Sequence, residues 1–281
     1  MDSAKVIAIG ALSVEPLMRY FRNPGEIKAA LPIITVPTVA STSSETDHFA
    51  VATEWRTHEK IGLASPFIFP RVSLIDPELT LTLPLKPTLS GAFDIMSHTL
   101  ERYLTTKVIS PLTDGINEAV LRMVVNSVPK VVAKLNDLEA RGQLLWASVV
   151  GNSQFGLLGG GGGGQPVHAM EHPLSGYYDI AHGDGLAALF PAWMRSIESV
   201  KEERIATFAR NVFGEKDGIG ALEKWLGKVG MKLRLRDLGI KPELFDEMAQ
   251  SAIKLALPRQ IEMSPVPLNE EYVLRIYKDS Y

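Results

Sequence analysis

The sequence predicts an α/β segment over residues 1–86, followed by an all-helical segment over residues 87–281. Two observations carry this prediction. Short apolar runs bounded by turn residues fill the first segment, whereas from about Pro87 onward apolar residues recur at helical spacing. A chain of 281 residues is also long enough to bury a large core in one or two domains.

The individual elements follow from local patterns. The periodicity of AKVIAIGALS (4–13) fits either a helix or a strand, and LPIITVPTVAS (31–41) predicts a buried strand that enters a Ser/Thr-rich loop. HFAVATEW (48–55) and RVSLIDPEL (71–79) are also typical of strands. Four later stretches predict helices: TLSGAFDIMSHTLERYLTT (88–106), GINEAVLRMVVNSVPKVVAKLND (115–137), ARGQLLWASVVGNSQ (140–154) and KEERIATFARNVFG (201–214).

Composition excludes several classes of function. The net charge is −3, with basic residues spread along the chain, so neither nucleic acid nor an anionic membrane is an expected partner. The chain has no cysteine, which excludes disulfides and thiolate zinc sites. No apolar run reaches the roughly 18 residues of a membrane span, and no signal peptide opens the sequence. We therefore expect a soluble, cytoplasmic protein.

A run of six glycines, Gly159 to Gly164, is the only low-complexity stretch. A phosphate-binding loop needs glycines at set positions between a strand and a helix N-terminus, and this run follows a helical pattern instead. We interpret it as a flexible connector. Pro166 then suits the first turn of the next helix.

The histidines are concentrated in one place, because three of the six lie between His168 and His182. His168 and His172 are four residues apart, as are Asp94 and His98, and residues four apart share one helix face. One carboxylate and three imidazoles suit Fe²⁺ or Zn²⁺. Two ligand sets remain open.

In the first, the metal ligands are Asp94, His98, His168 and His182, and His172 faces the substrate. In the second, His168, Glu171 and His172 form the H-x-x-E-H motif of a zinc peptidase, with Glu243 or Glu247 as a further ligand. The second set leaves Asp94, His98 and His182 without a role. It also places Pro173 inside a helix that should be regular.

Three segments resemble the iron-containing (group III) alcohol dehydrogenases. VPTVASTSSE (36–45) is similar to that family's P-T-T-x-G-T-G-S-E loop, with Ser41 and Ser43 replacing two glycines. HAMEHPLSGYYDIAHGDGLA (168–187) resembles one signature, and its residue pattern is most similar to that of the butanol dehydrogenases. LIDPELTLTLPLKPTLSGAFDIMSHTLERYLT (74–105) resembles the other signature, at Asp76, Pro77, Pro84, Gly91, Asp94, His98 and Glu101.

The resemblance implies a dinucleotide-binding α/β domain (1–86) and an all-helical metal domain (87–281), with the active site between them. It implies an NAD- or NADP-dependent alcohol dehydrogenase or aldehyde reductase for small primary alcohols or aldehydes, with Fe²⁺ or Zn²⁺ as the metal. The implied metal ligands are Asp94, His98, His168 and His182, and the implied catalytic residue is His172. Cofactor contacts are implied for Thr38, Thr42 and Lys60.

The sequence departs from the family at its start, because the family's Gly-Gly-Gly-Ser pyrophosphate loop has no counterpart before Asp2. We therefore expect an N-terminally truncated member whose dinucleotide-binding domain is only partly present. The alternative is a metal-binding protein with impaired catalysis, since cofactor affinity would fall without that loop. The exposed sheet edges of a partial domain also predict a homo-oligomer.

Overall fold

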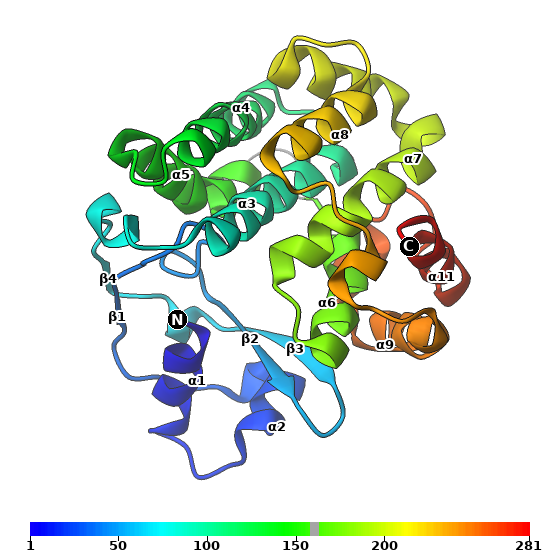
Figure 1. Cartoon of the computed structure of the whole chain (residues 1–281). Coiled ribbons are helices and arrows are strands. Elements are labelled where there is room, and N and C mark those ends of the chain that lie inside the picture. Colours follow the sequence, from blue (N-terminus) through cyan, green and yellow to red (C-terminus); the bar gives the residue numbers. More distant parts are fainter. Residues whose placement is uncertain (158–162) are drawn as a thin grey trace.

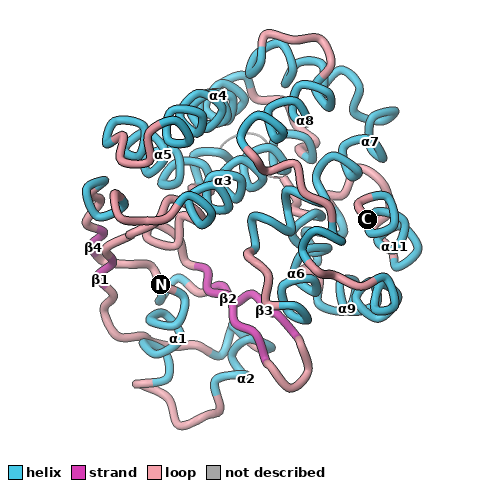
Figure 2. Tube along the Cα trace, in the orientation of Figure 1, coloured by secondary structure: helices cyan, strands magenta, loops and turns pink. Residues whose placement is uncertain are grey.

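The computed structural model describes residues 1–157 and 163–281, and Figure 1 shows a small N-terminal part below a larger array of helices. In the described residues, strands occur only in the N-terminal part (Figure 2). The strands are β1 (Ile34–Thr35), β2 (Phe49–Glu54), β3 (Glu59–Ala64) and β4 (Val72–Ser73). The α-helices are α1 (Asp2–Gly10), α2 (Leu17–Arg22), α3 (Leu85–Thr105), α4 (Pro111–Ala133), α5 (Leu138–Gly151), α6 (Pro166–Tyr178), α7 (His182–Phe208), α8 (Gly218–Val229), α9 (Phe245–Leu255), α10 (Pro258–Glu262) and α11 (Glu270–Asp279).

The N-terminal part follows the predicted pattern with two exceptions. The segment 71–79, predicted as a strand, forms only the two-residue β4 and then leads into the 3-10 turn η3 (Pro77–Thr80). The ambiguous segment 4–13 forms most of helix α1, and the predicted strand 48–55 forms β2, which pairs antiparallel with β3. The long buried strand predicted over 31–41 is wrong. Only β1 forms there, it pairs in parallel with the two-residue β4, and its Ile34 side chain is 68% exposed. Pro32 and Pro37 flank this strand, and a proline has no N–H to extend a hydrogen-bonded ladder.

The helical part is built around α3. Every residue from Thr88 to Thr105 is buried, because α3 packs against α4, α5 and α7. The helices predicted over 88–106, 115–137 and 140–154 correspond to α3, α4 and α5. The predicted helix over 201–214 forms the end of α7 and a following π-helical turn, η5 (Ala209–Phe213), that ends at Gly214 with φ +72°.

Each of the two parts has its own apolar core. The smaller includes Ile9, Phe21, Leu63 and Ile68, all from the N-terminal part. The larger lies among α3 to α11 and includes Phe93 and Trp193. The interpretation of the glycine run as a connector falls mainly on residues 158–162, which lie outside the described residues. None of the helices in the described ranges is long and apolar enough to cross a membrane.

The N-terminal part meets the helical part where strand β3 packs against α6 and α9 (Figure 1). Helix α6 begins with Pro166 at its first position, as the sequence predicts. The loop before β2 also reaches α3, because Gly91 allows a close approach. A Cβ at Gly91 would lie 2.3 Å from the carbonyl oxygen of Ala40. The first turns of α6 and α7, the middle of α3 and this loop therefore surround one region.

Candidate metal centre and cleft

Helix α3 supplies the first two side chains of a buried cluster. Asp94 and His98 lie one turn apart on the same face, and His98 Nε2 is 3.3 Å from Asp94 Oδ1. Both side chains are buried. The two side chains of the D-x-x-x-H pair therefore lie together, as the four-residue spacing predicts.

Two further histidines reach the same carboxylate oxygen from α6 and α7. His168 Nε2 and His182 Nε2 are each 3.8 Å from Asp94 Oδ1. His182 is the first residue of α7, and Gly183 after it allows that helix to touch α3. A Cβ at Gly183 would lie 1.9 Å from the carbonyl oxygen of Ser90. The structure thus brings together the first of the two sets considered from the sequence.

The opposite nitrogen of each imidazole has its own partner. His168 Nδ1 contacts Glu101 Oε2, and His182 Nδ1 contacts Glu171 Oε2. The side-chain Nε2 of Gln165 lies 2.5 Å from His98 Nδ1, so the amide donates to that nitrogen. For His168 and His182, the carboxylate acceptor at Nδ1 holds the proton there and leaves the Nε2 lone pair available for a metal.

The other oxygen of Asp94 and the carboxylate of Glu101 are held in the same manner. The Ser41 hydroxyl donates to Asp94 Oδ2 over 2.6 Å, and the Val167 backbone N–H donates to Glu101 Oε1 over 2.5 Å. The Ser41 backbone N–H in turn donates to Ser148 Oγ over 3.0 Å. The loop between β1 and β2 is therefore tied to both α3 and α5 at the cluster.

Two polar atoms at the centre lack hydrogen-bond partners. Asp94 Oδ1 and His168 Nε2 are both fully buried and accept or donate no hydrogen bond within the described residues. Potential ligand atoms of Asp94, His98 and His168 all lie within 4.8 Å of one another. Buried polar atoms are normally satisfied, so an oxygen and a nitrogen left unpaired together fit a divalent cation bound between them.

Burial and the neighbouring charges set the protonation states of Asp94, His98 and His168. Burial raises the pKa of Asp94, but the neighbouring His98 and His168 outweigh it, so that the pKa lies below its usual range. Burial, and then the nearby His168, lower the pKa of His98 well below its usual value. Burial lowers the pKa of His168, but the Glu101 and Asp94 carboxylates raise it to about 9 overall. Asp94 is therefore ionised and His98 neutral at pH 7, which are the forms that bind metal, whereas His168 carries a proton that metal binding would release.

His172 lies one turn after His168 on α6, with its ring centre 5.7 Å from that of His182. No ion pair joins it to Asp94 among the residues described, unlike the other three histidines. Burial, and then the charge of Lys60, lower the pKa of His172 well below its usual value, so the imidazole is neutral at pH 7. His172 is thus placed beside the cluster and not within it.

A cleft of about 330 Å³ opens over the cluster and is lined by His98, His168, His172 and His182. Lys60 and Thr42 also line it. Lys60 Nζ is 3.3 Å from His182 Nδ1 and 3.5 Å from Glu171 Oε2. Thr38, by contrast, is exposed and is not among the residues that line this cleft.

The geometry also bears on the peptidase alternative. Pro173 lies inside α6, which continues through it to Tyr178. Other observations count against that alternative. Glu171 is fully buried, and its two oxygens contact Ser175 and His182. Glu247 accepts a hydrogen bond from Tyr177 over 2.8 Å. Glu171 is therefore oriented as a partner of His182 and not as a base facing a bound water.

The sequence did not reveal the roles of Gln165, Glu171 and Ser41 as partners of the cluster. Glu171 was visible only as part of H-x-x-E-H, and no spacing rule links it to His182 eleven residues later. Gln165 directly precedes the helix-starting Pro166, and that position was the only available signal. These contacts depend on how α3, α6 and α7 pack, which local periodicity does not specify.

Comparison with known proteins agrees with this arrangement. Residues 88–281 match the C-terminal part of the Fe-containing alcohol dehydrogenase family, and residues 1–77 match the iron-containing alcohol dehydrogenase family. The chain is 34% identical to NADH-dependent butanol dehydrogenase A of Clostridium acetobutylicum and 37% identical to butanol dehydrogenase B of the same organism. Each similarity covers 100% of this chain and 74% of the relative.

The solved structures show the same relationship. The crystal structure of NADH-dependent butanol dehydrogenase A from Thermotoga maritima superimposes with a TM-score of 0.92 at 34% identity, covering 99% of this chain and 73% of that one. The crystal structure of a 1,3-propanediol oxidoreductase gives a TM-score of 0.84 at 27% identity, covering 100% of this chain and 74% of that one. The sequence resemblance is therefore confirmed: the chain belongs to the iron-containing alcohol dehydrogenase family of oxidoreductases.

Proposed function

We propose that this protein is a metal-dependent, NAD(P)-linked alcohol dehydrogenase that acts on primary alcohols and the corresponding aldehydes. In this proposal Asp94, His98, His168 and His182 hold one Fe²⁺ or Zn²⁺ ion. The names of the two Clostridium acetobutylicum relatives, which refer to butanol and NADH, support a small aliphatic substrate and NAD(H).

One observation carries the metal assignment. Three imidazole Nε2 atoms face the same oxygen of Asp94, while each Nδ1 already has a partner. An ordinary network of hydrogen bonds would use both nitrogens. An orientation that leaves His168 Nε2 unpaired beside a buried and unpaired carboxylate oxygen is one that a cation stabilises.

The chain's own residues then have distinct tasks in the reaction, which converts an aldehyde, NAD(P)H and a proton into an alcohol and NAD(P)⁺. When bound, the metal supplies a Lewis acid for the substrate oxygen, and the nicotinamide supplies the hydride. We assign proton transfer at the substrate oxygen to His172, because it is neutral and lines the cleft beside the cluster. Lys60, Thr42 and Thr38 are assigned to the cofactor side.

We further propose that the two apolar cores correspond to two domains, residues 1–86 and 87–281, with the cleft between them. The cleft is lined from both, by Thr42 and Lys60 on one side and by His98, His168 and His182 on the other. Hydride transfer between a cofactor and a substrate held on opposite walls needs this arrangement.

Metal content and turnover, measured separately, test the proposal. His182→Ala should lower the metal content after dialysis, whereas His172→Ala should retain nearly wild-type metal and lose aldehyde-dependent NAD(P)H oxidation. Equal metal loss in both variants would show that the ligand assignment is wrong. A wild-type protein that keeps its metal but has no turnover would favour the alternative of a metal-binding chain with impaired catalysis.

A further inference from the structure

A second cavity of about 250 Å³ adjoins the cleft over the metal centre, and the two share Arg102, Gln165 and Gln260 among their lining residues. Apolar side chains form part of its wall, including Phe49, Phe69 and Leu257. A ligand that reached the cluster could therefore extend into this cavity without leaving the protein.

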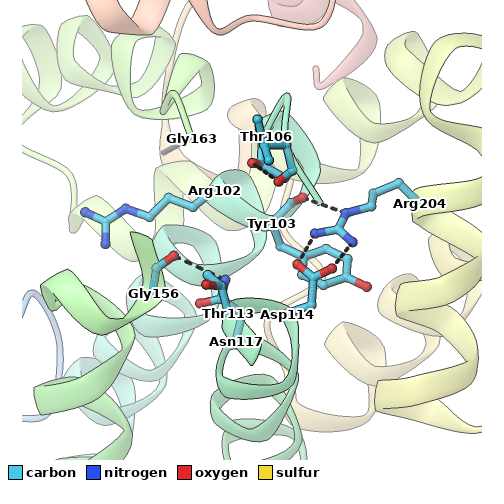
Figure 3. A pocket seen from close by; sticks show the side chains of 10 residues that line it. Arg102, Tyr103, Thr106, Thr113, Asp114, Asn117, Gly156, Gly163 and Arg204 are labelled. Atoms are coloured by element: carbon cyan, nitrogen blue, oxygen red, sulfur yellow. Dashed lines mark hydrogen bonds and ion pairs between the residues drawn. The ribbon is translucent and has the colours of Figure 1, made fainter. Parts of the chain in front are cut away.

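Arg102 is the unusual group in this cavity. Arg102 is only 8% exposed, yet its Nη1 atom has no hydrogen-bond partner. Its guanidinium also makes no ion pair with any described residue. In Figure 3 the Arg102 side chain points away from Asp114, which Arg204 binds instead. A buried guanidinium without a partner is costly, so native structures usually provide it with an anion.

The neighbouring carboxylates are already engaged. Both oxygens of Glu101 are bonded, to the Val167 N–H and to His168 Nδ1. Asp47 Oδ1 is 2.7 Å from Lys5 Nζ and also accepts the Phe49 N–H. Residues 158–162, outside the described part of the chain, are one leucine and four glycines, so they contribute no carboxylate side chain.

A second cation makes the cavity more positive. Arg259 lies on its rim, is exposed and forms no ion pair within the described ranges. Burial, and then the charge of Arg259, lower the pKa of Arg102 to about 10, so the guanidinium is still charged at pH 7. Two unpaired arginines facing one cavity of this size create a site for an anionic group.

We propose that Arg102 and Arg259 form an anion pocket that binds the carboxylate at the far end of the substrate. This inference rests on the proposed dehydrogenase function and names its substrate class, which is short-chain ω-oxo acids and the corresponding ω-hydroxy acids. A planar guanidinium can bind a carboxylate through two parallel hydrogen bonds. The apolar wall then contacts the connecting chain.

The position of Arg102 on α3 sets the length of that chain. Arg102 follows His98 by four residues, so it lies one turn further along the same helix face, about 6 Å in axial rise. A substrate with its aldehyde at the cluster and its carboxylate at Arg102 therefore needs a chain of a few carbons. 4-Oxobutanoate and butanal form a matched pair of probes, since they share four carbons and differ in the terminal carboxylate.

Steady-state kinetics of the metal-loaded protein test this specificity. The ratio of kcat/KM for 4-oxobutanoate to that for butanal should exceed one and should fall about 10- to 100-fold in Arg102→Gln, the effect of one charge-assisted hydrogen bond. Arg102→Lys should keep part of the preference, and Arg259→Gln should lose a smaller part. Lys216→Gln, which removes a charge from an exposed loop remote from the cavity, is the control. An unchanged ratio in Arg102→Gln would overturn the proposal.

Calorimetry separates this inference from the proposed function. 4-Hydroxybutanoate should bind the Zn²⁺-loaded protein more tightly than 1-butanol does, and Arg102→Gln should remove that difference, whether or not the protein turns over. If neither aldehyde is reduced, the dehydrogenase proposal fails, and this titration still decides the anion pocket. Equal binding of the two alcohols would contradict it. A higher KM for NAD(P)H in Arg102→Gln, with the aldehyde ratio unchanged, would assign the guanidinium to the cofactor and would also overturn it.

Discussion

Replacing Glu101 by glutamine should weaken metal binding without unfolding the protein. Glu101 is fully buried on α3, where Oε1 accepts the Val167 N–H and Oε2 contacts His168 Nδ1. Both partners point a donor at the carboxylate when His168 carries its proton on Nδ1. Glutamine has the same shape, but it offers one acceptor and one donor in place of two acceptors.

The amide can therefore satisfy only one of these two donors. If its oxygen accepts the Val167 N–H, its NH₂ group faces His168 Nδ1, and the imidazole proton moves to Nε2. That tautomer cannot bind metal, because Nε2 is the nitrogen that faces Asp94. To bind metal, His168 would have to return its proton to Nδ1. In that tautomer the Nδ1–H faces the glutamine NH₂ group, so two donors oppose each other and the charge-assisted hydrogen bond to residue 101 is lost. The resulting loss should be about 2 kcal/mol, or roughly 30-fold in the metal dissociation constant.

Competition with a chromogenic chelator measures this dissociation constant directly for Zn²⁺. Glu118→Gln is the matched control, since Glu118 is also a buried carboxylate, binding Tyr103 and Asn211 at 2.9 and 2.8 Å, but it does not contact the metal cluster. It should lower thermal stability without changing metal affinity. A Glu101→Gln protein that is folded by circular dichroism and binds Zn²⁺ within threefold of wild type would refute the tautomer argument.

Two further predictions concern a glycine and a serine beside the cluster. Gly183→Ala should lower both stability, by about 1–3 kcal/mol, and metal content, because the new Cβ would lie 1.9 Å from the Ser90 carbonyl oxygen. Gly227→Ala, at a helical site where the added Cβ would meet no other part of the protein within 4 Å, should raise the melting temperature slightly, and the opposite order in thermal melts would contradict this reasoning. Ser41→Gly should weaken metal binding several-fold by removing the hydrogen bond to Asp94 Oδ2, which the same chelator competition would detect; an unchanged dissociation constant would show that this hydroxyl is dispensable.

The fold was predictable where a long periodic pattern determines the structure. The helical pattern of 88–106 corresponds to α3, whose residues Thr88 to Thr105 are all buried. The prediction failed over 31–41, where an apolar run bracketed by prolines forms only a two-residue strand with Ile34 exposed. An apolar run shows that a segment can be buried, but a strand also needs neighbours to pair with, and that information is not local.

The candidate site was predictable to the extent that its spacing is helical. The pair Asp94 and His98 follows from the four-residue repeat alone, and the structure places it as expected. The choice between His172 and His182 did not follow from spacing, because His172 has the helical relation to His168 and His182 does not. Our proposal of His182 rests on packing, since α7 begins at His182 and Gly183 brings that end of the helix against α3.

The two serines in the loop before β2 indicate how this chain differs from its family at the cluster. Ser41 and Ser43 stand where the family's loop pattern has glycines, and Ser43 has φ +62°, a conformation that favours glycine. Each serine compensates with a hydrogen bond: Ser41 donates to Asp94, and Ser43 donates to the Ser148 carbonyl on α5. Glycine would permit the same turn but could make neither contact. The loop is therefore positioned at the cluster by side-chain hydrogen bonds to α3 and α5, which couples its conformation to the ionised state of Asp94.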